Sequence, residues 1–65
     1  MKFEEFDKLI RLRVKRINTN CGKITKPMIN RAYKAATERQ ESDTKGRITW
    51  MDEVAYWSGF IAVKQ

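Results

Sequence analysis

The sequence predicts an all-α fold, a small three-helix domain that takes in the whole chain, residues 1–65. Apolar residues recur at three- and four-residue spacing in three segments, which is the pattern of amphipathic helices. Polar stretches containing glycine separate the segments. A chain of 65 residues is long enough for one domain and buries only ~60% of its unfolded surface, so we expect a small margin of stability.

The first predicted helix spans about residues 2–18. Its apolar residues fall on one face, acidic residues gather at its start, and basic residues gather at its end. That order of charge complements the helix dipole. The stretch at residues 18–22 is expected to end the helix with an asparagine or glycine in the left-handed conformation.

The second predicted helix spans about residues 27–40. Pro27 suits its first turn, where a backbone N–H is not needed. Three small residues, Ala32, Ala35 and Ala36, permit another helix to approach closely. A polar loop of about six residues then leads to the third helix, a normal length for a helix–helix connection.

The third predicted helix spans about residues 49–64 and is apolar nearly all round. Such a helix is typically central in its fold, so we expect the other two helices to pack around it. Gly59 interrupts the pattern, and an extended tail over residues 60–65 is the alternative to helix there. The expected core contains Phe3, Phe6, Ile10, Val14, Ile29, Tyr33, Trp50, Val54, Trp57 and Ile61.

Two near-identical tetrapeptides precede the second and third helices, GKIT at residues 22–25 and GRIT at residues 46–49. Thr25 and Thr49 are each predicted to be a helix N-cap, with the hydroxyl accepting a first-turn N–H. Asp52, three residues after Thr49, completes an approximate capping box. A nucleotide-binding phosphate loop is excluded because its G-x-x-x-x-G-K-[ST] pattern is absent.

The formal net charge of +6 indicates a polyanionic partner, either nucleic acid or an acidic protein surface. Simple solubility and a solvated helix face are the alternatives. Helix N-termini also bind phosphate, and the second residue of each tetrapeptide lies beside one. The first hypothesis is therefore a small, basic, non-enzymatic regulatory protein that associates with nucleic acid through phosphate contacts. The residues expected to make these contacts are Lys8, Arg11, Lys15, Arg16, Lys23, Lys26 and Arg47.

The aromatic third segment supports a second hypothesis. The third helix has two apolar stripes along its length. One stripe is enough to face the core, and the second is either buried as well or left exposed for a partner. If the second stripe is exposed, the protein is an interaction module, a phage-type inhibitor or adaptor that docks on a larger enzyme or nucleic-acid machine, or it forms a homodimer. The expected contact residues are Leu12, Tyr56, Phe60 and Val63.

The composition argues against an enzyme. The chain has no histidine, the commonest general acid–base residue, and no constellation of nucleophile, base and orienting group. We therefore expect no metal, no other cofactor and no small-molecule substrate. The lone Cys21 excludes an internal disulfide and favours a reducing, cytoplasmic location, and no apolar run is long enough to span a membrane.

The segment E-V-A-Y-W-S-G-F, residues 53–60, resembles the first helix and turn of helix-turn-helix transcription regulators of the AraC and MerR kinds. Ala55 and Gly59 match the alanine packed between the two helices and the glycine that opens the turn. The resemblance implies DNA binding through a following recognition helix. Six residues follow Gly59, which leaves no room for that helix, so the resemblance assigns no base-reading residue.

Overall fold

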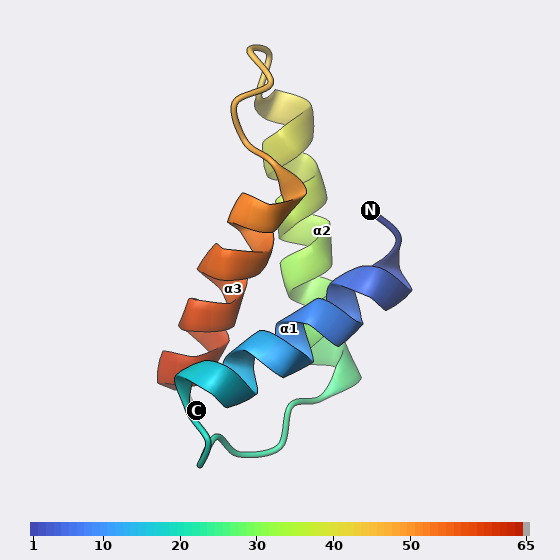
Figure 1. Cartoon of the computed structure of the whole chain (residues 1–65). Helices are drawn as coiled ribbons and strands as arrows, with labels where there is room; N and C mark the ends of the chain where they lie inside the picture. The colour runs from blue at the N-terminus through green and yellow to red at the C-terminus, as the bar shows by residue number, and fades with distance from the viewer. Residues whose placement is uncertain (65) are drawn as a thin grey trace.

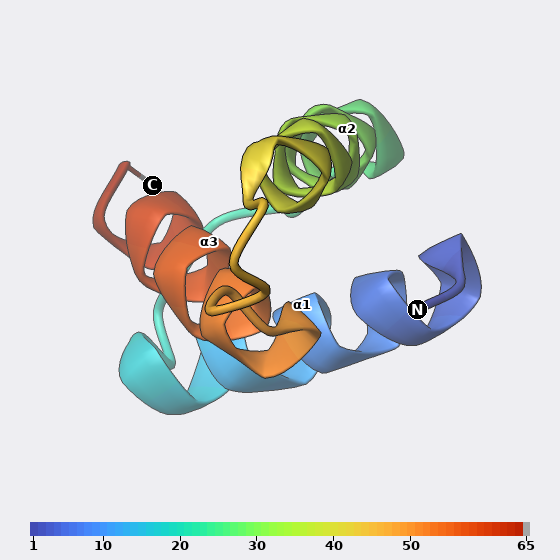
Figure 2. The same ribbon diagram turned by 90° about the horizontal axis from the view of Figure 1, so that it is seen from above.

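The computed structural model describes residues 1–64 and confirms the all-α, three-helix fold (Figure 1). Helix α1 spans Phe3–Ile17, α2 spans Lys26–Ser42 and α3 spans Trp50–Lys64. Helices α2 and α3 run alongside each other, and α1 crosses both of them on one side (Figures 1 and 2). All three helices begin and end within two residues of the predicted limits.

Helix α1 buries one apolar face and ends in a local turn. Phe6, Ile10 and Val14 are fully buried on that face. At the end of the helix, the Asn18 backbone N–H donates to the Val14 carbonyl oxygen at 2.8 Å. The predicted left-handed cap is wrong, because Asn18 is extended with φ −142°. Its Oδ1 instead accepts the Asn20 N–H at 3.1 Å, an Asx turn that stops the helix.

Helix α2 begins as its sequence predicts but without a side-chain cap. Pro27 lies in the first turn, and Thr25 occupies the N-cap position with extended backbone angles. The Thr25 hydroxyl makes no capping hydrogen bond, so this part of the prediction is wrong. The Thr25 backbone oxygen still accepts the Ile29 N–H at 3.3 Å, which starts the helical ladder.

Helix α3 begins with the predicted capping box. The Thr49 hydroxyl accepts the Asp52 N–H at 3.1 Å, and the Asp52 carboxylate accepts the Thr49 N–H at 3.1 Å. Hydrogen bonding of the Asp52 carboxylate to Thr49, through the backbone N–H first and the side chain second, holds the pKa of Asp52 below its ordinary value of 3.8. The helix continues through Gly59 to Lys64, so residues 60–64 are helical rather than an extended tail, and Gln65 lies outside the described residues.

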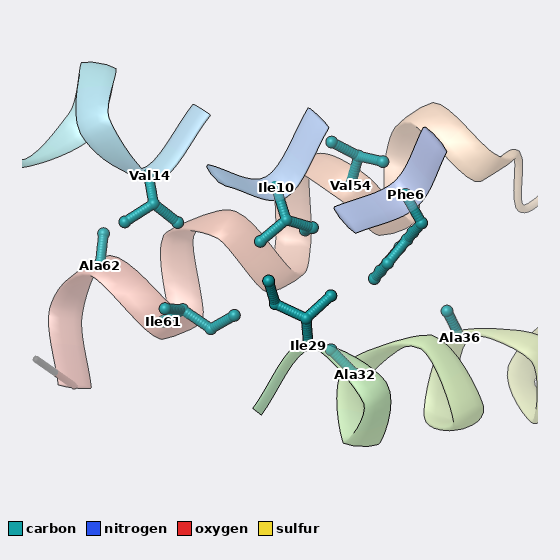
Figure 3. Close-up of a cluster of buried hydrophobic side chains, with 9 residues drawn as sticks. All are labelled: Phe6, Ile10, Val14, Ile29, Ala32, Ala36, Val54, Ile61 and Ala62. Carbon is teal, nitrogen blue, oxygen red and sulfur yellow. The ribbon is translucent and has the colours of Figure 1, made fainter. Parts of the chain in front are cut away.

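The core lies where the three helices meet (Figure 3). Six of the ten predicted core residues are buried, and the other four, Phe3, Tyr33, Trp50 and Trp57, are partly buried against them. Alanines from α2 and α3 complete the centre. The buried hydrophobic residues are Phe6, Ile10, Val14, Ile29, Ala32, Ala36, Val54, Ile61 and Ala62.

The expectation that the third helix is the central element is not confirmed. Helix α1 packs extensively on α3 and also on α2, whereas α2 and α3 have the smallest shared contact. A helix that crosses two others can bury one narrow stripe against both, as α1 does with Phe6, Ile10 and Val14 (Figure 3). One side of α3 consequently remains without a covering helix.

Aromatic rings tie the three helices together near the chain's N-terminus. Tyr33 stacks on Trp50 with centroids 5.4 Å apart and meets Phe3 and Phe6 edge-on at 5.5 and 5.3 Å. The Tyr33 hydroxyl donates to the Met1 carbonyl oxygen at 2.6 Å. The aromatic residues of α1, α2 and the start of α3 therefore pack against one another within the fold.

An ion pair between a half-exposed arginine and a buried glutamate links α2 to α3. The Arg39 Nε donates to the Glu53 carboxylate at 2.7 Å, and the Glu53 residue is only 1% exposed. A carboxylate at this depth is stable only with such a partner. Nothing in the helical periodicity predicted that Glu53 faces inward.

Candidate partner-binding face on the third helix

The part of α3 from Val54 to Val63 contains no charged residue. The side toward α1 and α2 is buried, but the opposite side is not. There Tyr56, Phe60 and Val63 are 51%, 46% and 81% exposed. We call these three residues the exposed α3 face. Large apolar side chains grouped on a surface helix are typical of an interface, since a solvated helix face normally carries charge.

The backbone between these side chains is accessible too. A Cβ added at Gly59, the neighbour of Phe60, would meet nothing within 4 Å. A partner can therefore approach the helix closely beside the rings. Small residues next to large ones give a surface with both recesses and projections, which favours close packing.

The aromatic rings of the exposed α3 face are oriented by their neighbour Trp57. The Tyr56 and Trp57 rings meet edge-on with centroids 4.9 Å apart and planes at 88°. Trp57 and Phe60 meet in the same manner at 5.5 Å and 73°. Edge-to-face contacts of this kind favour fixed ring positions. A partner that binds here loses little side-chain freedom on the protein's side.

Arg39 places positive charge at the edge of the face. Its guanidinium carbon lies 5.2 Å from the centre of the Tyr56 ring, within the range of a cation–π contact. The same side chain is paired with Glu53. The two contacts together hold Arg39 over the ring and leave half of its side chain accessible to a partner.

A hollow of about 220 Å³ opens beside Phe60, between α2 and α3. The Trp57 Nε1 is buried and has no hydrogen-bond acceptor among residues 1–64. We call the hollow between these two helices the α2–α3 hollow. It is lined by Met28, Arg31, Ala32, Trp57, Phe60 and Ile61.

Leu12, the fourth predicted contact residue, lies in a different place. It is 54% exposed and lines a separate hollow of about 240 Å³ between α1 and α3. Arg13, Arg16 and Met51 lie around the same hollow. The structure thus groups three of the four predicted partner-binding residues on one helix face and sets Leu12 apart from them.

Three of the predicted phosphate-contacting residues come together. Arg11, Lys15 and Lys23 line a hollow of about 290 Å³ at the junction of α1 with the following loop. Arg11 is engaged within the protein, because its Nε donates to Asp7 at 2.6 Å and its Nη1 donates to the Ile24 carbonyl oxygen at 2.9 Å. Lys15 and Lys23 are exposed beside it.

The other predicted cations are dispersed. Lys8 is exposed on α1, Arg16 lines the hollow beside Leu12, and Lys26 lies near Phe3 at the start of α2. Arg47 belongs to the α2–α3 loop, at the end of the molecule opposite the α1–α2 loop (Figure 1). The seven cations therefore do not form one continuous surface.

Sequence reasoning missed the α2–α3 hollow. Trp57 was assigned to the core, and nothing in the sequence pattern singled out Arg31. The residues come from two helices, and their meeting depends on how those helices cross.

Two further features, metal sites and membrane spans, concern the residues that the structure describes. Within residues 1–64, no group of three or more His, Cys, Asp or Glu side chains is placed to hold a metal ion. None of the three described helices combines the length and apolar character needed to cross a bilayer.

Comparison with protein-family models, with curated proteins and with solved structures gave no match for this chain.

Proposed function

We propose that this protein is an interaction module that docks through the exposed α3 face on a larger protein. The observation that carries the proposal is the uncharged stretch of α3, residues 54–63, with Tyr56, Phe60 and Val63 in solvent. Tyrosine and other aromatic residues dominate the energetics of protein interfaces. The ring contacts within this face make it ready for binding without rearrangement.

The partner's complementary surface is an apolar groove with acidic residues at its edge. The chain carries a net charge of +6, and Arg39 lies over Tyr56 at the border of the face. Opposite charge around an apolar centre speeds association and excludes wrong partners. Nucleic-acid bases are a poorer fit, because stacking surfaces for single strands combine rings with cations that follow the backbone. Residues 54–63 carry no cation, and Arg39 at their border is already paired with Glu53.

The proposal is tested by selecting binders from a displayed library of random peptides on the wild-type protein. We expect the selected peptides to lose about tenfold in affinity or more for Tyr56→Ser and Phe60→Ser, a loss of about 1.4 kcal/mol. Ile17→Ser is the matched control, because Ile17 is 53% exposed on α1 and lies outside the exposed α3 face. The Ile17→Ser variant should bind the same peptides with the affinity of the wild type.

Two results would count against the proposal. Equal loss with Ile17→Ser would show that the peptides bind any exposed apolar residue. Unfolding of Tyr56→Ser and Phe60→Ser, measured by circular dichroism, would show that these side chains hold the fold rather than serve a partner. Light scattering adds a third check, because a stable homodimer that Phe60→Ser dissociates would make a second copy the occupant of the face.

Association with nucleic acid is the second candidate function, favoured by the convergence of Arg11, Lys15 and Lys23 on one hollow. Phosphate contacts make affinity fall with salt, with a slope of ~0.9 per contact for duplex DNA. Binding to duplex and single-stranded DNA and RNA should therefore weaken strongly as salt rises. Lys15→Gln and Lys23→Gln should each lower the slope by about 1, and Arg47→Gln, as the control, should not. Absence of binding at low salt would exclude this function.

A further inference from the structure

The α2–α3 hollow has the dimensions of a site for one side chain. Its volume is about 220 Å³, below the ~300–1,000 Å³ typical of pockets for drug-sized ligands. Five of its six lining residues are apolar, and Phe60 also belongs to the exposed α3 face. A segment that contacts Phe60 on that face therefore lies at the edge of the opening.

The charged group at the hollow is Arg31. It is exposed at the rim and has no ion pair among the described residues, 1–64. A guanidinium favours a carboxylate as its hydrogen-bond partner. Arg31 can therefore pair with an acidic group that arrives with a ligand.

We propose that the α2–α3 hollow receives one apolar side chain of the docked protein and that Arg31 pairs with a carboxylate next to that side chain. The inference rests on the proposed function and specifies the partner's contact segment as an apolar anchor flanked by an aspartate or glutamate. A cationic flank is excluded by charge, since it would face Arg31 within a protein of net charge +6.

The test uses 4-phenylbutyrate, a small molecule with an apolar ring and a carboxylate, titrated into the ¹⁵N-labelled protein and followed by NMR. We expect shifts at the backbone amides of Arg31 and Phe60 and at the Trp57 indole N–H. The amine of the same skeleton, 4-phenylbutylamine, should bind about fivefold more weakly, which corresponds to about 1 kcal/mol for an accessible ion pair.

A pair of variants isolates the role of the charge. Arg31→Gln should lower the affinity for 4-phenylbutyrate about fivefold and leave that for 4-phenylbutylamine unchanged or higher. Lys34→Gln removes the same charge from an exposed position of α2 that does not line the hollow, and its affinity for 4-phenylbutyrate should stay that of the wild type. Equal effects of the two substitutions would overturn the inference, as would shifts confined to Tyr56 and Val63.

The peptide selection separates this inference from the proposed function. Selected peptides that depend on Phe60 but carry no acidic residue, and bind Arg31→Gln normally, would refute the hollow's assignment and leave docking on the exposed α3 face intact. Failure of every peptide to depend on Tyr56 or Phe60 would instead refute the docking function itself. A homodimer that Arg31→Gln dissociates would overturn the inference by making a second copy of the chain the occupant.

Discussion

The tetrapeptides GKIT, residues 22–25, and GRIT, residues 46–49, differ by one conservative exchange, yet different forces hold them. In GRIT the bonds are local. Thr49 and Asp52 exchange two capping hydrogen bonds, and the Ile48 N–H donates to the Asp43 carboxylate at 2.6 Å. Every partner lies within five residues in the sequence.

GKIT is held from a distance. The Thr25 hydroxyl makes no capping bond, and the residue three positions later is Met28, which cannot return one. The Ile24 carbonyl oxygen instead accepts from Arg11, thirteen residues earlier on α1. A side chain of another helix thus does at GKIT what neighbouring side chains do at GRIT.

The two tetrapeptides also lie in different surroundings. Lys23 lies at the same hollow as Lys15 and Arg11, and Arg11 donates to the carbonyl oxygen of the neighbouring Ile24. Arg47 has no such tie to α1 and remains in the α2–α3 loop at the other end of the molecule (Figure 1). The two similar tetrapeptides therefore each precede a helix, but the residues around them in the structure differ.

Asp43→Ala is the largest expected disruption of GRIT. The substitution removes a charge-assisted hydrogen bond to a half-buried loop and should lower the free energy of unfolding by about 2 kcal/mol, measured by urea denaturation. Asp43→Asn keeps an acceptor and should cost less. At GKIT, Arg11→Met should cost about 1 kcal/mol, because the Arg11 side chain is 42% exposed and water replaces part of its bonding. An equal cost for Asp43→Ala and Asp43→Asn would show that charge contributes nothing.

Substitution of the two tetrapeptide glycines by alanine should have the next largest difference in effect on stability. Gly46 has φ of 64°, and no other residue among 1–64 has positive φ. Gly46→Ala should destabilise by about 1.5 kcal/mol, because a Cβ is strained in that conformation although the space around it is open. Gly22→Ala should change stability by no more than about 0.5 kcal/mol. A larger loss at Gly22 than at Gly46 would contradict the assigned difference in backbone conformation.

The contrast between the tetrapeptides also shows which features the sequence predicts. The helices and the Thr49–Asp52 box follow from residues a few positions apart, whose spacing alone brings them together. The bond from Arg11 to Ile24 depends on how α1 lies against the following loop. Helical periodicity contains no information on that placement.

The candidate site divides in the same manner. Tyr56, Phe60 and Val63 are one face of one helix, so the sequence could group them, although it left their burial open. The α2–α3 hollow combines Arg31 of α2 with Trp57 of α3, and the inward Glu53 depends on Arg39. Such combinations require the crossing of two helices, which is fixed by packing over the whole core.

Thr49→Ala and Thr25→Ala test the caps themselves. Thr49→Ala should lower the free energy of unfolding by about 1 kcal/mol, because the Asp52 N–H loses its acceptor. Thr25→Ala should have almost no effect, since the Thr25 hydroxyl makes no capping bond. Thermal unfolding followed by circular dichroism measures both. A melting temperature lowered equally by the two substitutions would mean that Thr25 caps its helix after all.

The smallest expected difference between the two tetrapeptides is in pH dependence. Hydrogen bonds from the Thr49 backbone and hydroxyl region hold the pKa of Asp52 below 3.8, so the folded state binds its proton more weakly than the unfolded chain. The resulting stability is present in full above pH 3.8 and is lost as pH falls through the lower pKa of the folded protein.

Urea unfolding of the wild type and Asp52→Asn should therefore differ by a constant amount at neutral pH and converge in strong acid. Thr25→Ala, which has no carboxylate at the matching position, should differ from the wild type by the same amount at every pH. A difference between the wild type and Asp52→Asn that persisted unchanged into strong acid would show that the carboxylate's charge has no part in the cap.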